Sequence, residues 1–167
     1  MTNFLLIHLQ LTFGKILDIP LIVTEQNPSK LGNTIKELDV THATGIFDKS
    51  KFSMCIPEVQ EVIEKLPNKI ESVVIFGLES HICVEQTAMD FLASEKYSVH
   101  VVADCCLSRV AEDRAFALER LRSIGCFITT SENVIFKLMK DKNHPKFNDV
   151  RKLVTEPSTF PQLSNKL

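Results

Sequence analysis

The sequence predicts an α/β fold built around a parallel sheet. Short apolar, β-branched runs alternate along the chain with segments whose apolar residues recur at helical spacing, as expected for successive β-α units. The run Ser72–Phe76 has the continuous apolar character of a strand that is buried on both faces. A length of 167 residues, with 44 % hydrophobic and 24 % charged residues, indicates a single globular domain. We expect this domain to cover residues 1–156 and a C-terminal tail to cover residues 157–167.

The strands and helices follow from local composition. The expected strands are apolar runs between turn residues, at Leu21–Thr24, Ala43–Phe47, Ser72–Phe76, Ser98–Ala103 and Cys126–Thr130. The expected helices begin at a proline or at a capping serine: Pro57–Leu66, a helix capped by Ser80, Ala111–Ile124 ending before Gly125, Glu132–Lys140 capped by Ser131, and Pro145–Leu153. The stretch Asn27–Asn33 holds Pro, Ser and Gly and is expected to be a loop.

One cysteine lies where a nucleophile could be activated. Gly77 interrupts the central strand and Ser80 can cap the next helix, which places Cys83 in the first turn after the carboxyl end of a strand. Unpaired N–H groups and the helix dipole stabilise a thiolate there, and parallel sheets bind ligands at this edge. The alternative is that Cys83 is a small buried hydrophobic residue, as many cysteines are. We take Cys83 as the candidate nucleophile.

Several motifs resemble one enzyme family. The segment G-L-E-S-H-I-C-V-E-Q-T-A, which contains Cys83, resembles the nucleophile segment of the isochorismatase-like cysteine hydrolases, which include nicotinamidases and N-carbamoylsarcosine amidases. Further segments resemble the animal isochorismatase domain-containing proteins: Thr24–Gly32, Lys49–Met54, Val99–Asp104 and Asp141–Phe147. The resemblance covers roughly Lys15–Pro157 and leaves residues 1–14 divergent. It implies a three-layer α/β/α fold with a doubly wound, mainly parallel sheet.

The resemblance also implies a set of site residues. Cys83 matches the nucleophile, and Lys49 matches the family's lysine, which is spaced three residues before an aromatic-Ser pair that begins here with Phe52. The main-chain N–H groups of Glu79 and Cys83 match the oxyanion donors, with a cis peptide bond expected before Glu79. His81 and Phe52 are the further candidates for contacting substrate. The implied reaction is hydrolysis of a small amide-type molecule through a cysteine thioester.

The family's catalytic Asp has no counterpart here. It belongs to a first central strand that is followed by a long helix, whereas the first acidic residue of this chain is Asp18. Phe4–Leu11 could be that strand, with His8 in place of the Asp, or Asn3–Asp18 could be the helix, with the strand missing. A missing central strand would leave two exposed sheet edges. The alternative function is therefore a catalytically impaired relative with a structural or regulatory role.

The resemblance and the composition also bear on cofactors and partners. Nicotinamidases carry a metal site with two histidines in the region that reads Glu25–Gly32 here, and this region has no His, so we expect no metal and no cofactor. Oligomers are common in the family, so we expect a homo-oligomer acting on a small molecule. The net charge of −2, the single Tyr and the absence of Trp give no support for a nucleic-acid partner.

The remaining expectations concern location. The five cysteines form an odd set without framework spacing, which favours reduced thiols in the cytoplasm. The apolar N-terminus is too short for a membrane span and lacks the basic region of a signal peptide, so we expect no membrane association. The ending Ser164–Leu167 is close to a peroxisomal address, which is the alternative location.

Overall fold

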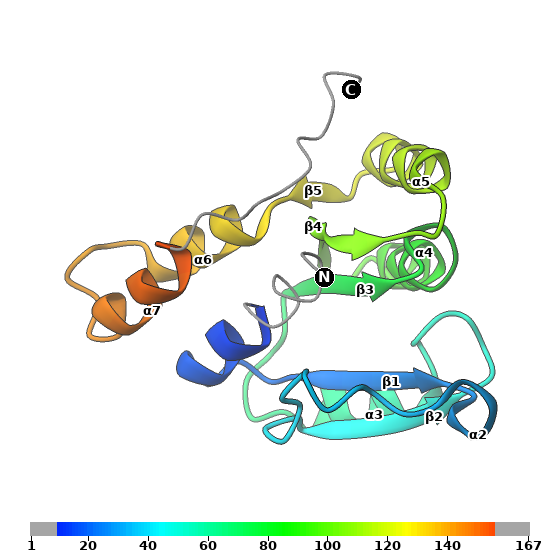
Figure 1. Ribbon diagram of the computed structural model, residues 1–167, viewed down its shortest axis with the longest axis horizontal. Helices are drawn as coiled ribbons and strands as arrows, with labels where there is room; N and C mark the ends of the chain where they lie inside the picture. Colours follow the sequence, from blue (N-terminus) through cyan, green and yellow to red (C-terminus); the bar gives the residue numbers. More distant parts are fainter. Residues whose placement is uncertain (1–9, 156–167) are drawn as a thin grey trace.

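The parallel sheet of the protein is divided into two. The computed structural model describes residues 10–155. In it, β1 (Ile22–Gln26) pairs with β2 (Gly45–Lys49), and a second sheet has the order β3 (Ser72–Leu78), β4 (Ser98–Leu107), β5 (Phe127–Thr129). All of these pairs are parallel, as the sequence predicts. Figure 1 shows β1 and β3 running in the same direction on either side of the division, and no ladder joins them.

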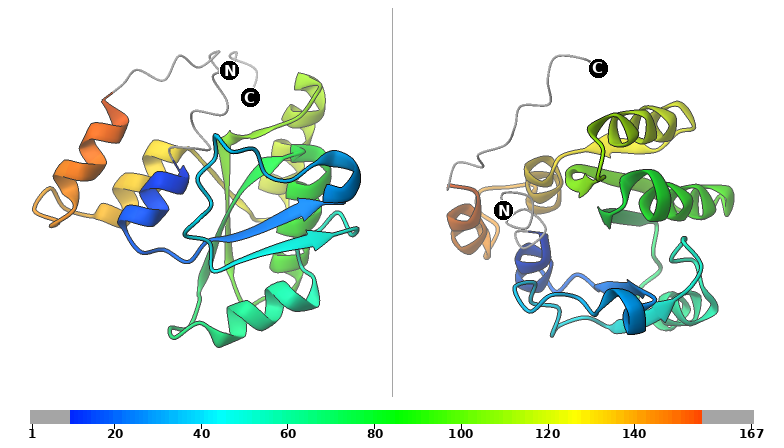
Figure 2. Two further views of the ribbon diagram at one scale, coloured as in Figure 1. Left: turned by 60° about the horizontal axis from the view of Figure 1, so that its bottom comes forward. Right: turned by 45° about the vertical axis from the view of Figure 1, so that its right-hand side comes forward.

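Helices cover both faces of the strands. Between and after the strands lie α2 (Pro28–Leu31), α3 (Pro57–Lys65), the π-helical turn η1 (Ser80–Val84), α4 (Glu85–Ala93), α5 (Ala111–Ser123), α6 (Ser131–Met139) and α7 (Phe147–Val154). Residues 10–16 are also helical. Figure 2 shows α3, α4 and α5 on one side of the strands, and residues 10–16, α6 and α7 on the other. The three-layer α/β/α architecture is therefore confirmed.

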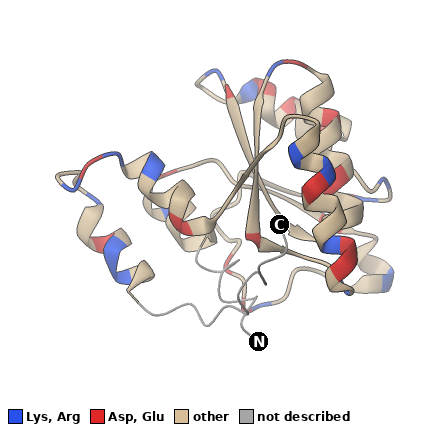
Figure 3. Ribbon diagram, turned by 90° about the horizontal axis from the view of Figure 1, so that it is seen from above, with Lys and Arg blue, Asp and Glu red and all other residues tan. Residues whose placement is uncertain are grey.

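Strand β4 shows why both layers are needed. Val101 and Val102 are fully buried, and because neighbouring side chains of a strand point to opposite faces, they belong to different clusters. Val101 packs with residues of α4 and α5, including Phe91 and Leu121. Val102 packs with Leu11 of the N-terminal helix and with α6. Most charged residues lie outside this core, on the helices and loops (Figure 3).

Several element boundaries differ from the predictions. Strand β4 continues to Leu107, beyond the expected end at Ala103, and its register with β3 shifts between Ile75 and Gly77. The predicted loop Asn27–Asn33 contains the single turn α2, which begins at Pro28. The last helix begins at Phe147, two residues after the expected start at Pro145, because the turn before it closes through the Phe147 N–H and the carbonyl of His144.

Both predicted serine caps are wrong. At η1 the N-cap residue is Glu79, and the buried Ser80 hydroxyl has no hydrogen-bond partner within residues 10–155. At α6 the cap is Thr130, whose hydroxyl accepts a hydrogen bond from the Asn133 N–H at 3.3 Å. Ser131 instead donates its N–H and its hydroxyl to the carboxylate of Asp104, which joins β4 to α6.

The N-terminal alternatives are partly resolved. The helix over residues 10–16 agrees with the helical alternative Asn3–Asp18 over that range. The strand alternative, Phe4–Leu11, is wrong at residues 10 and 11, which are helical. His8 and the rest of that strand lie outside the described residues, as does the predicted tail at 157–167. Within residues 10–155, no helix has the length and hydropathy needed to cross a bilayer.

Candidate active site

The fold brings Lys49 and Cys83 together from different sheets. Lys49 is the last residue of β2, and Cys83 lies in η1, directly after β3. Lys49 Nζ is 3.7 Å from Cys83 Sγ. The two residues lie at the carboxyl ends of their parallel strands, which is the edge where such sheets bind ligands. The contact places an ammonium group beside a thiol.

The ammonium group of Lys49 is held by neutral oxygens. The residue is only 7 % exposed. It donates to Gln26 Oε1 at 2.6 Å, to the Phe52 carbonyl at 2.8 Å and to the Lys51 carbonyl at 3.1 Å. Its hydrogen-bond and ion-pair partners within residues 10–155 include no carboxylate. A buried positive charge of this kind favours negative charge on the neighbouring sulfur.

The turn that carries Cys83 is fixed by Thr87. The Thr87 hydroxyl donates to the Cys83 carbonyl at 2.6 Å and accepts from the Met54 N–H at 2.9 Å. Thr87 therefore ties the nucleophile's turn to the segment that follows β2 and Lys49. Neither Thr87 nor Gln26 was predicted as a site residue, although each lies in a segment on which the family resemblance rests.

The main chain between β3 and η1 contains a cis peptide bond. The Leu78–Glu79 peptide bond is cis, as the resemblance implies. The Glu79 carbonyl accepts from the N–H groups of Ile82 and Val84, which closes the turn that carries Cys83. The Glu79 side chain points elsewhere and accepts from the Arg109 N–H at 2.8 Å.

The other two predicted site residues do not line the cavity beside Cys83. His81 Nδ1 lies 2.9 Å from the Ser108 hydroxyl, and its Nε2 lies 3.9 Å from the Asp113 carboxylate, so the ring faces the β4–α5 connection. Phe52 is 49 % exposed and contributes its carbonyl to Lys49. The ring of Phe52 is not among the groups that line the cavity.

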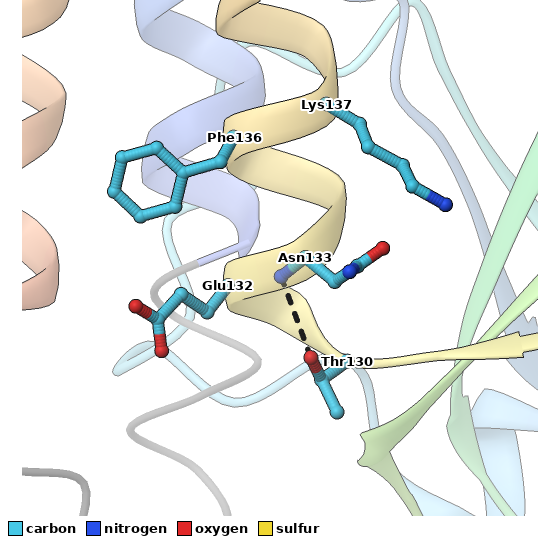
Figure 4. Close-up of a pocket in the computed structure, with 5 residues that line it drawn as sticks. All are labelled: Thr130, Glu132, Asn133, Phe136 and Lys137. Carbon is cyan, nitrogen blue, oxygen red and sulfur yellow. Dashed lines mark hydrogen bonds between the residues drawn. The ribbon is translucent and has the colours of Figure 1, made fainter.

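A cavity of about 660 Å³ opens next to the Lys49–Cys83 contact. Its walls are largely apolar and come from both sheets, including Val23 of β1 and Val74 of β3. This size is in the range of small-molecule sites. The described residues form no group of three His, Cys, Asp or Glu side chains that could hold a metal ion. A shallower hollow on α6, lined by Thr130, Glu132, Asn133, Phe136 and Lys137, includes no thiol (Figure 4).

The remaining cysteines are held as neutral thiols. Burial raises the pKa of Cys55, Cys105 and Cys126, and it raises the pKa of the fully enclosed Cys106 to about 12. Cys106 Sγ faces the Ile75 carbonyl at 3.9 Å, inside the core. A thiol in this state is a poor nucleophile, so these cysteines have the character of packing residues.

The comparison with known proteins identifies the family. Residues 9–133 match the model of the isochorismatase domain. The chain belongs to the isochorismatase domain family. It is 47 % identical over 154 residues to isochorismatase domain-containing protein 1 of Salmo salar, covering 92 % of this chain and 54 % of that protein. It is 45 % identical to isochorismatase domain-containing protein 2 of Xenopus laevis over 87 % of this chain and 69 % of that protein.

Solved structures of isochorismatase-like proteins share the fold. A protein described as MAR1 ribonuclease from Caenorhabditis elegans superposes with a TM-score of 0.89 at 37 % identity, covering 99 % of this chain and 85 % of that one. The YcaC gene product of Escherichia coli, described as an octameric hydrolase of unknown specificity, superposes with a TM-score of 0.72 at 22 % identity, covering 92 % of this chain and 79 % of that one. This isochorismatase domain spans about half the length of the first curated relatives that it matches.

Proposed function

We propose that the protein is a hydrolase that cleaves a small amide-type molecule through a thioester on Cys83. The observation that carries this proposal is the 3.7 Å contact between Lys49 Nζ and Cys83 Sγ at the end of the cavity. An ammonium group beside a thiol stabilises the thiolate, which is the reactive form of cysteine. Membership of a family with hydrolase-type homologues supports the same chemistry.

The expected reaction has two stages. The Cys83 sulfur attacks the substrate carbonyl, and the main-chain N–H groups of Glu79 and Cys83 stabilise the oxyanion that forms. The carbon–nitrogen bond then breaks, the leaving nitrogen takes up the proton lost by the thiol, and an acyl thioester remains on Cys83. Water attacks the thioester, which releases a carboxylic acid and restores the thiol. Lys49 lies beside the sulfur and opposes the negative charge that develops on it.

The second candidate is a catalytically impaired relative with a structural or regulatory role. It is favoured by the neutral surroundings of Lys49, because no carboxylate within residues 10–155 contacts Lys49 or Cys83. A positioned general base typically contributes about 10²–10⁴-fold to a rate. A chain that lacks such a base would keep the fold and a reactive thiol but lose most of its turnover.

We further propose a small-molecule substrate, a homo-oligomeric state and a cytoplasmic location. The apolar cavity favours a small uncharged molecule over a polyanion. The octameric state described for the Escherichia coli protein supports testing for an oligomer. The name of the Caenorhabditis elegans relative makes RNA cleavage a competing activity that the same assay should include.

The test compares the wild-type chain with Cys83→Ser on a panel of small primary amides, a carbamoyl amine, isochorismate and a short RNA. Cys55→Ser is the matched control, since Cys55 is a half-buried thiol outside the cavity. We expect turnover of an amide, an acyl adduct on Cys83 by mass spectrometry, and loss of both in Cys83→Ser alone. Full activity in Cys83→Ser would refute the thioester mechanism. A folded wild-type chain without any Cys83-dependent turnover would favour the impaired relative.

A further inference from the structure

The hydroxyl group of Thr87 closes a ring of contacts around the Lys49–Cys83 pair. Lys49 donates to the Phe52 carbonyl at 2.8 Å. Two residues further along the chain, the Met54 N–H donates to the Thr87 hydroxyl at 2.9 Å. That hydroxyl donates to the Cys83 carbonyl at 2.6 Å, and Cys83 Sγ lies 3.7 Å from Lys49 Nζ, which completes the ring. Within this ring, the side chain of Thr87 joins the segment after β2 to the turn after β3.

The two hydrogen bonds of the Thr87 hydroxyl have different origins. Threonines in helices often bond the carbonyl four residues earlier, so the bond to Cys83 alone would be an ordinary feature of α4. The bond from Met54 is not local, because Met54 lies 33 residues away in the sequence. Met54 also follows the residues whose carbonyls accept from Lys49. The hydroxyl therefore connects the surroundings of the ammonium group with the turn of the nucleophile.

Burial makes this connection stronger than a neighbouring one. Lys51 also joins the same segment to α4, through its ion pair with Asp90 at 2.9 Å, but both side chains are exposed. Exposed ion pairs contribute little to holding two segments together. Thr87 is 2 % exposed. Loss of its hydroxyl would leave the Met54 N–H and the Cys83 carbonyl without this partner in a partly buried place, which is unfavourable.

We infer that Thr87 is a positioning residue for the Lys49–Cys83 pair. Its hydroxyl fixes residues 50–54 against the turn of the nucleophile, and the carbonyls of that segment hold the ammonium group of Lys49 beside the sulfur. Lys49 and Cys83 are 34 residues apart in the sequence, so tertiary contacts of this kind set the distance between Nζ and Sγ. The inference rests on the role proposed for Lys49 in the thioester mechanism.

The test measures the rate at which iodoacetamide alkylates Cys83 at pH 6.5, followed by peptide-resolved mass spectrometry. Thr87 borders the cavity, so turnover alone would not separate positioning from contact with a substrate, whereas alkylation needs no substrate. Thr87→Val keeps the shape of the side chain and removes the hydroxyl. We expect it to react about threefold more slowly, because the ammonium group is no longer held beside the sulfur. Thr87→Ser keeps the hydroxyl and should stay within about 1.5-fold of the wild type.

Ser131→Ala is the matched control for the loss of a buried hydroxyl. Ser131 is 3 % exposed, and its hydroxyl donates to the carboxylate of Asp104 at 2.6 Å, at the start of α6. This variant should also lower the midpoint of a urea titration, because it too breaks a buried hydrogen bond. The rate at Cys83 should not change, since neither residue belongs to the ring of contacts. The enclosed Cys106 should stay unlabelled in every folded variant and so reports an intact core.

A double variant shows whether Thr87 acts through Lys49. In a chain that carries Lys49→Met, the ammonium group is absent, so the hydroxyl has no charge left to position. Adding Thr87→Val to this chain should then change the rate at Cys83 by less than about 1.5-fold, although the same substitution slows the wild-type chain. A hydroxyl that only stabilises the turn of the nucleophile would change the rate by the same factor in both chains.

The outcomes separate this inference from the proposed function. The inference is supported if Thr87→Val slows alkylation, Thr87→Ser restores it, and the effect disappears in Lys49→Met. It is overturned if Thr87→Val reacts as fast as the wild type or faster, if serine does not restore the rate, or if the effect persists without Lys49. A Lys49→Met chain that reacts like the wild type would contradict the proposed function, and the inference with it.

A measurement on the wild-type chain covers the case in which Thr87→Val does not fold. Amide hydrogen exchange at Met54 reports its bond to the Thr87 hydroxyl directly. This amide should exchange at least about a hundredfold more slowly than in an unfolded peptide, because the bond must open first. Exchange at the unfolded rate would show that the bond does not persist in solution, and it would overturn the positioning role of Thr87.

Discussion

Replacing Lys49 by Met should slow the alkylation of Cys83, because it removes the cation that lies 3.7 Å from the sulfur. Methionine keeps most of the aliphatic volume of the side chain and removes the charge. At about 4 Å, the attraction between an ammonium and a thiolate is worth about 1 kcal/mol in bulk water and about 4 kcal/mol near a protein surface. An attraction of this size corresponds to a factor of about 5 to 900 in an equilibrium constant.

The rate of alkylation should fall by less than this factor. A thiolate that is less stabilised is also more nucleophilic, with a Brønsted coefficient of about 0.4–0.5. The two effects together give an expected decrease of about 3- to 40-fold in the reaction of Cys83 with iodoacetamide at pH 6.5. The measurement is peptide-resolved mass spectrometry, which follows each cysteine separately.

Lys51→Met provides the matched control. Lys51 carries the same charge two residues along the chain, but it is exposed and pairs with Asp90 at 2.9 Å. Its loss should leave the rate at Cys83 unchanged within about twofold, because exposed charges farther away are screened by salt. If Lys49→Met and Lys51→Met gave the same rate as the wild type, the ammonium would not stabilise the thiolate, and the proposed role of Lys49 would be wrong.

Three further predictions test the surroundings of the site. Cys106, with a pKa raised to about 12 by burial, should hold only about one part in ten thousand as thiolate at pH 8, so mass spectrometry should find it unlabelled in the folded chain and labelled after unfolding. Hydrogen bonds from Thr34 and Asn33 lower the pKa of Glu25 below 4.5, so Glu25→Gln should cost about 1 kcal/mol of unfolding free energy at pH 7. The pKa of Glu25 is lower in the folded chain than in the unfolded chain. The difference in unfolding free energy between the wild type and Glu25→Gln is therefore present above pH 4.5. Urea titrations should show it disappearing as the pH falls below 4.5. Arg120 donates two hydrogen bonds to the buried carboxylate of Glu85. Arg120→Met should therefore lower the unfolding free energy, measured by thermal denaturation, by about 1–3 kcal/mol. Removing a charge elsewhere on α5 should lower it by less than about 0.5 kcal/mol.

The nucleophile is the part of the site that local sequence describes well. A strand, a glycine and a helical segment in succession place Cys83 at the carboxyl end of β3, and the structure agrees. The form of the turn was not predictable from the same residues. Ser80 has the identity of a capping residue, but the chain enters a π-helical turn in which its hydroxyl is buried without a partner within the described residues. Composition does not distinguish these two kinds of turn.

The end of strand β4 shows where residue preferences for strands fail to predict a boundary. The prediction ended this strand at Ala103, and the next residue, Asp104, is of a type that is generally unfavourable in strands. In the structure, Asp104 stays in β4, since its carboxylate accepts the N–H and the hydroxyl of Ser131, a residue far along the chain. A tertiary contact thus outweighs a local preference. Cys105 and Cys106 then continue the strand into the core.

The division of the sheet could be anticipated only through one of the two N-terminal alternatives, the one in which the first strand is missing. Which strands pair depends on groups distant in sequence, and the apolar runs of β1 and β3 look equally suited to a central position. The contact between Lys49 and Cys83 was also not predictable from local sequence. Both residues were recognisable by the family resemblance, but the distance between them depends on how the two sheets lie against each other.

The contact between these two residues crosses the division. Lys49 belongs to the β1–β2 sheet, and Cys83 follows a strand of the β3–β4–β5 sheet, so the Nζ–Sγ distance is set by the spacing of two sheets that share no ladder. Thr87, through the Met54 N–H, is one of the polar links that oppose their separation. The reactivity of Cys83 should therefore depend on how firmly the two sheets are held together.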